Sequence, residues 1–73
     1  MINIHLLKSY IVKNGMTIDE VARNLGINPA TLYRKMNGKS ELSIGEAEQL
    51  ISTLSIEKND IVSIFFNDKL EEM

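Results

Sequence analysis

The sequence predicts an all-α domain built from five short helices. Apolar residues recur at intervals of three and four along most of the chain, which is the period of an amphipathic helix, and no alternating run of useful length suggests a strand. Pairs of residues that cap helix N-termini precede two of the apolar stripes, and glycines follow three of them. The 73 residues are expected to form one domain, because so short a chain supports only one small core.

The first helix is expected from Ile2 to Lys13. Its inward stripe consists of Ile4, Leu7 and Ile11, with Tyr10 beside them. Asn14 and Gly15 follow, and this pair is typical of a left-handed C-cap.

The second helix begins after Thr17, which forms a capping box with Glu20 in the sequence T-I-D-E. Val21 and Leu25 face inward, and Ala22 between them is small enough for another helix to cross closely. Gly26 is expected to end this helix, because glycine adopts the left-handed conformation without steric cost.

The third helix begins after Asn28, a favourable N-cap, and Pro29 occupies the first helical position, where its missing N–H costs nothing. Leu32 and Met36 lie one turn apart and are expected to anchor the helix to the core. Asn37 and Gly38 end it.

The fourth helix begins with a second capping box, formed by Ser43 and Glu46 in the sequence S-I-G-E. Its inward face consists of Ala47, Leu50, Ile51 and Leu54.

The last helix, at about residues 58–66, carries more apolar surface than one core requires. Its apolar residues are Ile61, Val62, Ile64, Phe65 and Phe66. At about 100° per residue they cover an arc of about 200°, whereas core packing needs a stripe of roughly 100°. We expect three of them to close the core and Val62 and Phe66 to form a homodimer interface. The alternative is that the residues after Asn67 fold back over these two side chains.

Charge is distributed unevenly, although the net charge is only −2. Residues 1–40 carry six basic and two acidic side chains, for a net charge of +4, whereas residues 41–73 carry two basic and eight acidic ones, for −6. Such asymmetry suggests that one face binds a polyanion. The alternative is that these are solvated helix surfaces with an accidental bias.

Several classes of protein are disfavoured by composition. The absence of cysteine excludes disulfides and thiolate metal sites. No leader sequence is recognised, and no apolar run approaches the roughly 20 residues that span a bilayer. A soluble cytoplasmic protein with no membrane association is therefore expected.

Only three residues separate Leu25 from Pro29, and so short a connection favours a helix crossing near about 90–120°, as in a helix-turn-helix unit. The stretch MTIDEVARNLGINPATLYRKMNGK, residues 16–39, resembles the helix-turn-helix of lambda-repressor-like, XRE-type regulators. The positions that carry this resemblance are Thr17, Val21, Ala22, Leu25, Gly26, Ile27, Asn28, Leu32, Asn37, Gly38 and Lys39. The closing IVSIFF is similar to a subgroup of small phage and mobile-element regulators.

The resemblance implies a compact five-helix, lambda-repressor-like domain over residues 1–73, with the helix-turn-helix at about 17–37. It also implies that the third helix, Pro29 to Asn37, enters the major groove of double-stranded DNA. The residues implied in DNA binding are Thr17, Asn28, Pro29, Ala30, Thr31, Tyr33, Arg34, Lys35, Asn37, Lys39 and Ser40.

Within this set Arg34 is the strongest candidate for reading a base, because its guanidinium matches guanine O6 and N7 with two hydrogen bonds. A phosphate contact without base specificity is the alternative for Arg34. Tyr33 can donate or accept through its hydroxyl, or it packs on its own helix as a surface aromatic. Pro29 and Ala30 offer only apolar contact, and Asn28 is occupied in capping.

The remaining residues are candidates for phosphate contacts, which fix the register of a protein on DNA rather than its choice of sequence. Thr17 stands at a helix N-terminus that suits a phosphate. Asn37, Lys39 and Ser40 follow the third helix. Lys35 either joins them or solvates the helix surface.

Two positions depart from the family pattern. Many relatives carry a glutamine after the first cap, which reaches a phosphate, whereas Ile18 cannot do so. Some relatives pair an arginine of the first helix with a glutamate of the third. Ile11 and Met36 stand at the corresponding positions, and an apolar contact there is physically reasonable.

The leading function is a sequence-specific transcriptional regulator, a repressor of phage or mobile-element type that is expected to act by occupying a palindromic operator as a homodimer. A protein-interaction module on the same fold, an antirepressor-like or antitoxin-like partner, is the alternative, because the chain has an acidic half.

The sequence gives little support for an enzymatic function. His5, the only histidine, is interpreted as solvated or partly packed, and no phosphate loop, metal-ligand cluster or nucleophile–base pair is present. We expect no catalytic residue, metal, cofactor or small-molecule ligand.

Overall fold

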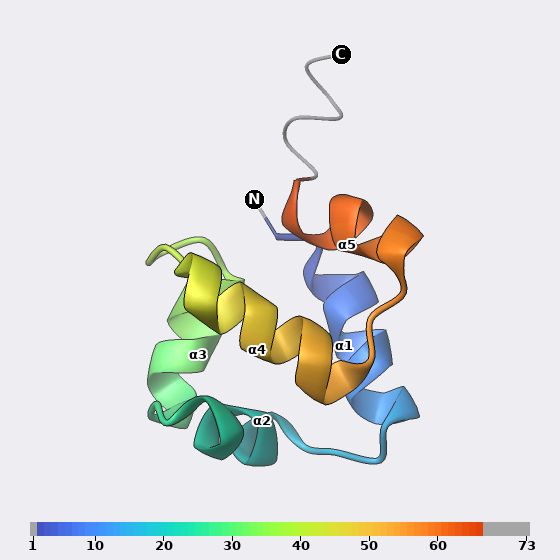
Figure 1. Cartoon of the computed structure of the whole chain (residues 1–73). Helices are drawn as coiled ribbons and strands as arrows, with labels where there is room; N and C mark the ends of the chain where they lie inside the picture. Colours follow the sequence, from blue (N-terminus) through green and yellow to red (C-terminus); the bar gives the residue numbers. More distant parts are fainter. Residues whose placement is uncertain (1, 67–73) are drawn as a thin grey trace.

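The structure, a computed structural model, describes residues 2–66, and this part of the chain contains five helices and no strand (Figure 1). They are α1 (Ile4–Lys13), α2 (Ile18–Leu25), α3 (Pro29–Met36), α4 (Ile44–Leu54) and α5 (Lys58–Phe65). The prediction of an all-α fold is confirmed.

The start of α1 is the helix boundary that the sequence pattern misplaced most, by two residues, whereas α3 and α5 each end one residue earlier than expected. Helix α1 was expected from Ile2 but begins at Ile4, because Asn3 is its N-cap. The Asn3 side chain accepts a hydrogen bond from the Leu6 N–H at 3.2 Å, while its backbone stays extended. The Asn3 N–H donates to the Ile64 carbonyl at 2.9 Å, so the residue also attaches this end of the chain to α5.

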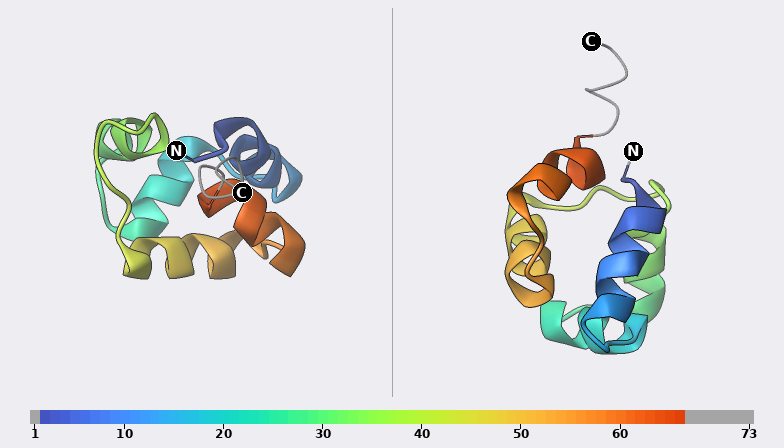
Figure 2. Two further views of the ribbon diagram at one scale, coloured as in Figure 1. Left: turned by 90° about the horizontal axis from the view of Figure 1, so that it is seen from above. Right: turned by 90° about the vertical axis from the view of Figure 1, so that its right-hand side faces the viewer.

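The five helices surround one core. α2 and α5 lie at opposite ends of the domain, with α1 and α4 between them (Figures 1 and 2). α2 contacts both α3 and α4, and α1 contacts α5. Among the other helices, α3 therefore packs mainly on α2, which in turn packs on α4.

The core consists almost entirely of residues that the helical pattern assigns to inward faces. Its buried members are Leu7, Tyr10, Ile11, Val21, Ala22, Leu32, Met36, Leu50, Leu54, Ile56 and Ile64. Ile4, Leu25 and Ile51 were also expected to face inward, and they are half-buried against this cluster. Ile56 lies in the connector after α4, outside any helical stripe, and its burial was not predicted.

The apolar residues of α5 divide as the sequence predicts. Ile64 is fully buried, and Ile61 and Phe65 are half-buried against the core. Val62 and Phe66 keep 44% and 52% of their surface exposed. The alternative in which residues after Asn67 cover these two side chains lies outside the described residues.

A tyrosine connects α1 to the start of α5. The Tyr10 hydroxyl donates to the Asp60 carboxylate and accepts from the Glu57 N–H, with 3.2 Å between the nitrogen and the oxygen of the second bond. The hydrogen bond to Asp60 is the main reason that the pKa of Tyr10 is raised. The Asn14 amide donates to the Leu54 carbonyl at 2.9 Å, so the end of α1 is also attached to the end of α4.

At the C-terminal ends of α1, α3 and α4, a residue in the left-handed conformation ends the helix. Gly15 and Gly38 follow α1 and α3 with φ of 68° and 77°. In each case the next residue donates to the carbonyl five residues before it, as in a Schellman motif. α4 ends in the same way, but the left-handed residue is Ser55, with φ of 50°. A serine pays a steric cost there that a glycine would not.

Replacement of Ser55 by glycine is expected to stabilise the fold by about 0.5–1 kcal/mol, because the strain of the left-handed serine is removed. Urea unfolding followed by circular dichroism measures this change. Ser52→Gly is the matched control. Ser52 is exposed inside α4, where glycine is unfavourable, so this variant should lose about 0.5–1 kcal/mol. Equal destabilisation by both glycines would contradict the left-handed cap.

Candidate nucleic-acid interface

The connection between α2 and α3 consists of three residues, 26–28. Gly26 ends α2 with φ of 73°, and the Ile27 N–H then donates to the Ala22 carbonyl at 3.0 Å. Asn28 caps α3, and its side-chain oxygen accepts from the Ala30 N–H at 2.8 Å. The predicted cap, stop and proline positions all occur, and together they turn the chain sharply into α3.

α3 presents one face to the core and the opposite face to solvent. Leu32 and Met36 are each only 1% exposed. The residues at spacings of three, four and seven on the other side are all exposed, and they are Ala30, Tyr33, Arg34 and Asn37. We call these four residues the outward stripe. All four are DNA-binding candidates from the sequence, and the fold brings them together on one surface.

Side chains of the outward stripe are partly fixed by their own helix. An Arg34 guanidinium nitrogen lies 3.4 Å from the Thr31 hydroxyl oxygen, and the Asn37 amide donates to the Tyr33 carbonyl at 2.8 Å. Tyr33 has 44% of its surface exposed. Thr31 and Pro29 are half-buried at the margins of the stripe.

The N-terminus of α2 carries the other predicted contact, Thr17. Its hydroxyl accepts from the Glu20 N–H at 3.2 Å, and the Glu20 carboxylate accepts from the Thr17 N–H at 3.0 Å, which confirms the capping box. Thr17 is exposed. Asp19 and Glu20 place two carboxylates in this first turn, and their charge weakens the attraction of this helix end for a phosphate.

The segment after α3 holds Lys39 and Ser40. The Lys39 N–H donates to the Arg34 carbonyl at 2.9 Å, so the chain leaves α3 in a defined direction. Lys39 is exposed and Ser40 is half-buried. These two residues therefore lie directly beyond the C-terminal end of the outward stripe.

Lys35 has partners within the protein. Its ammonium nitrogen lies 3.0 Å from Glu46 Oε1 and 3.0 Å from the Glu41 carbonyl oxygen. The side chain is only 16% exposed. No sequence signal indicated this ion pair, because eleven residues separate its members and the pairing depends on where α4 begins.

The capping box of α4 shares this ion pair. Glu46 accepts from the Ser43 N–H at 2.9 Å, and the Ser43 hydroxyl accepts from the Glu46 N–H at 3.0 Å. The pKa of Glu46 lies below its ordinary value, first because of the hydrogen bond from Ser43 and then because of Lys35.

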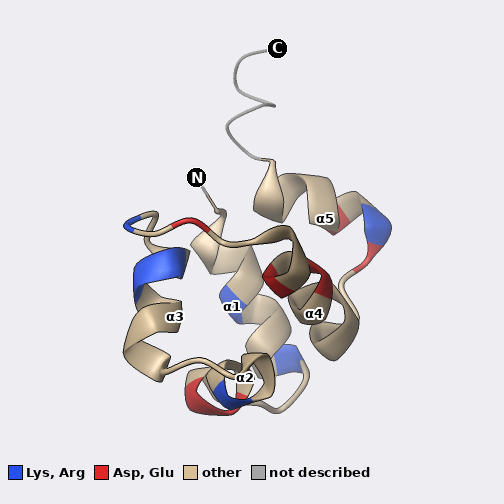
Figure 3. Cartoon of the chain, turned by 60° about the vertical axis from the view of Figure 1, so that its left-hand side comes forward, with Lys and Arg blue, Asp and Glu red and all other residues tan. Residues whose placement is uncertain are grey.

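Figure 3 shows the charge distribution on the fold. The charged residues within α3 are Arg34 and Lys35, both basic, whereas those of α4 are Glu46 and Glu48, both acidic. The two acidic side chains of α4 do not cover the outward stripe, whose four residues remain exposed.

Residues 2–66 show neither a metal-ligand cluster nor a membrane-spanning helix. This part of the chain contains no cluster of three or more acidic, histidine or cysteine side chains arranged to hold a metal ion. None of its helices is both long enough and apolar enough to cross a membrane.

Comparison with known proteins identifies one family. The model of a family described as helix-turn-helix, of the XRE or lambda-repressor-like type, matches residues 7–61. Searches of the curated proteins and of the solved structures gave no significant match.

Substitution of Glu46 tests the electrostatics of the α4 cap. Glu46→Gln should lower the free energy of unfolding at pH 7 by about 0.5–1 kcal/mol, the range of partly exposed ion pairs. A depressed pKa in the folded state means that this contribution is complete above the ordinary value of 4.5 and is lost as pH falls through the folded value.

The stability difference between the native protein and Glu46→Gln should therefore narrow when urea unfolding is repeated at falling pH. Glu48→Gln is the control, since Glu48 is exposed on the same helix. A difference that is independent of pH, or the same for both variants, would refute this role of the Glu46 charge.

Proposed function

We propose that this chain, which belongs to the lambda-repressor-like, XRE-type helix-turn-helix family, is a sequence-specific DNA-binding transcriptional regulator. The outward stripe carries this proposal. It is the exposed side of a short helix that follows a tight turn, and the helix bears no acidic residue. α3 would lie in the major groove, which admits one α-helix.

Arg34 is the proposed reader of a base. It lies on the outward stripe, where the side chain is exposed and a guanidinium nitrogen lies 3.4 Å from the Thr31 hydroxyl oxygen. An exposed guanidinium suits the two acceptors of guanine, O6 and N7. Tyr33 would add one hydrogen bond through its hydroxyl, and Ala30 would give apolar contact, for example to a thymine methyl group.

Lys39, Ser40, Asn37 and Thr17 are the proposed phosphate contacts. Lys39 and Asn37 are exposed at the C-terminal end of α3, and Thr17 is exposed at the start of α2. They lie at the two ends of the helix-turn-helix, where a DNA backbone on either side of the groove would pass. Such contacts position the protein and give its affinity a strong salt dependence.

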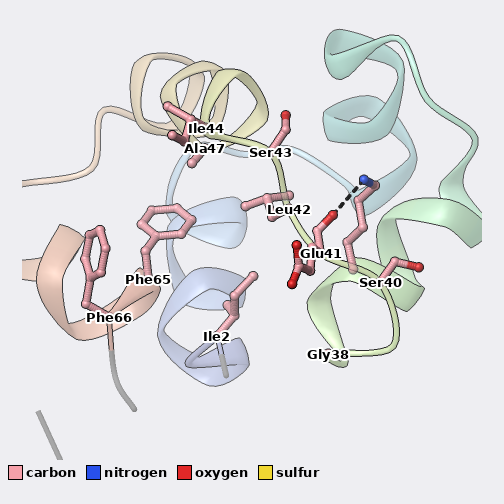
Figure 4. A pocket seen from close by; sticks show the side chains of 11 residues that line it. Ile2, Gly38, Ser40, Glu41, Leu42, Ser43, Ile44, Ala47, Phe65 and Phe66 are labelled. Atoms are coloured by element: carbon pink, nitrogen blue, oxygen red, sulfur yellow. Dashed lines mark hydrogen bonds between the residues drawn. The ribbon is translucent and has the colours of Figure 1, made fainter. Parts of the chain in front are cut away.

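A homodimer on a palindromic operator is the proposed active form. Val62 and Phe66 on α5 are exposed apolar residues, and Ile44 at the start of α4 is 80% exposed. Phe66, Ile44 and Ser40 line one groove of about 410 Å³ (Figure 4). A contact between two copies at Phe66 would lie at the opposite end of this groove from Ser40 and would help to set the spacing of the two α3 helices (Figure 4).

The regulator is proposed to be a repressor of the phage or mobile-element type that acts in the cytoplasm by occupying its operator. The part of the chain that the structure describes consists of the five-helix unit alone.

Arg34→Ala is expected to weaken binding to the operator by about 1–3 kcal/mol and to relax the preference at one base pair. The operator is first selected from a random DNA pool, and affinities are then measured by fluorescence anisotropy. Arg23→Ala is the control, because Arg23 is an exposed arginine of α2 outside the outward stripe. Equal losses on all sequences would reassign Arg34 to phosphate contact.

The salt dependence of binding separates DNA recognition from a protein-interaction function. With about six phosphate contacts, the logarithm of the affinity should fall with the logarithm of salt concentration at a slope near about −5. Lys39→Ala should weaken binding on all sequences and make this slope shallower by about 1 for each bound subunit. A flat salt response of the native protein would instead favour the protein-interaction module.

Sedimentation in the absence of DNA tests the dimer. The native protein is expected to be dimeric at high micromolar concentration, and Val62→Asp should make it monomeric. Val12→Asp is the matched control, because Val12 is a 75% exposed valine on α1. A native monomer under these conditions would rule out the proposed interface.

A further inference from the structure

We infer that Lys35 is a positioning residue, which fixes the segment carrying Lys39 and Ser40 against α4, and that its charge does not contact DNA. This inference rests on the proposed function, because it concerns how the phosphate-binding segment is held. It changes the role expected for Lys35 from the sequence, where it was grouped with the DNA contacts.

The inference starts from one oxygen atom. Glu46 Oε1 accepts from the Lys35 ammonium at 3.0 Å and from the Ser43 N–H at 2.9 Å. The same ammonium donates to the Glu41 carbonyl oxygen at 3.0 Å, so it reaches the segment between α3 and α4 as well as α4 itself. One lysine thus connects the last turn of α3 to the connecting segment and to the first turn of α4.

The position of Lys35 on α3 explains why it turns this way. Arg34 points to the solvent side, and Lys35 is rotated from it by about 100° toward the side of the helix that faces α4. Its side chain is 16% exposed and that of Glu46 is 19% exposed. Two of the three ammonium N–H groups are thus engaged within the protein, and little of the side chain is left for a phosphate to reach.

The connecting segment, residues 37–43, has few fixed points besides Leu42, which packs against the core. Its two ends are held by the Lys39 N–H on the Arg34 carbonyl and by the Ser43 N–H on Glu46. Between them, within the described residues, the Glu41 carbonyl is the backbone group that a side chain holds, and that side chain is Lys35. Loss of Lys35 should therefore loosen this segment while the rest of the core is retained.

The two possible roles of Lys35 differ in their salt dependence. A lysine that neutralises a phosphate contributes about 0.9 to the slope of log affinity against log salt. A positioning lysine contributes to affinity through geometry and leaves the slope almost unchanged. Lys35→Met should thus weaken binding about 3- to 10-fold on all sequences, with the slope of the native protein.

The experiment compares Lys35→Met with Lys39→Met, the same substitution at an exposed lysine four residues later. Anisotropy titrations with the selected operator are made at four or more salt concentrations. Amide hydrogen exchange, measured by NMR without DNA, is then followed at Lys39 and Ser43. Exchange at Ser43 should become several-fold faster in Lys35→Met and should not change in Lys39→Met.

Two results would overturn the inference. A slope that becomes shallower in Lys35→Met by as much as in Lys39→Met would show a phosphate contact. Unchanged exchange at Ser43 and Lys39 in Lys35→Met would show that the segment does not depend on this lysine. If Lys35→Met does not fold by circular dichroism, Lys35→Gln, which keeps a polar side chain, replaces it in both measurements.

The exchange measurement also separates this inference from the proposed function. If the native protein binds no DNA with the expected salt dependence, the proposed function fails. The role of Lys35 in holding the segment is then decided by the exchange at Ser43 alone, because that measurement contains no DNA.

Discussion

The exposed surface of α3 depends on the burial of two side chains, Leu32 and Met36. α3 has eight residues, and helices shorter than about 12–15 residues are marginal in water without tertiary packing. A buried side chain of this size contributes about 1.5–3 kcal/mol. Because the two side chains lie one turn apart, their packing fixes the rotation of α3 about its axis as well as its presence. The outward stripe is therefore a consequence of how the core is filled.

Signals that lie within a few neighbouring residues were sufficient to predict most of the fold. Both capping boxes form as expected, and Gly26 ends α2 in the left-handed conformation. The apolar period continues through Ile2, so it extended α1 too far, whereas the capping preference of Asn3 sets the true start. Ile56 was missed because a residue in a connector has no period to mark it, and its burial follows from the left-handed turn at Ser55.

Contacts between distant parts of the chain could not be predicted, because their members have no fixed spacing. Examples are Tyr10 with Asp60, Asn14 with Leu54, and Lys35 with Glu46. In the candidate site, the residue most affected by this limit of sequence-based prediction is Lys35. The exposure of Arg34 follows from the burial of Leu32 on the other side of the same helix, whereas the direction of Lys35 depends on the place of α4 in the fold.

The pairing of Lys35 also changes how the charge asymmetry of the chain should be understood. The excess of basic residues in the first half overstates the positive charge available at α3, because Glu46 of the acidic half neutralises one of its two cations. What stays exposed at this end of the helix-turn-helix is Arg34 and Lys39. With so few exposed cations, discrimination between DNA sequences would depend more on the geometry of Arg34 and on the spacing of two subunits than on general attraction to phosphate. The negative net charge is consistent with this balance, because it disfavours binding to DNA in general while a correctly spaced pair of stripes is still able to bind.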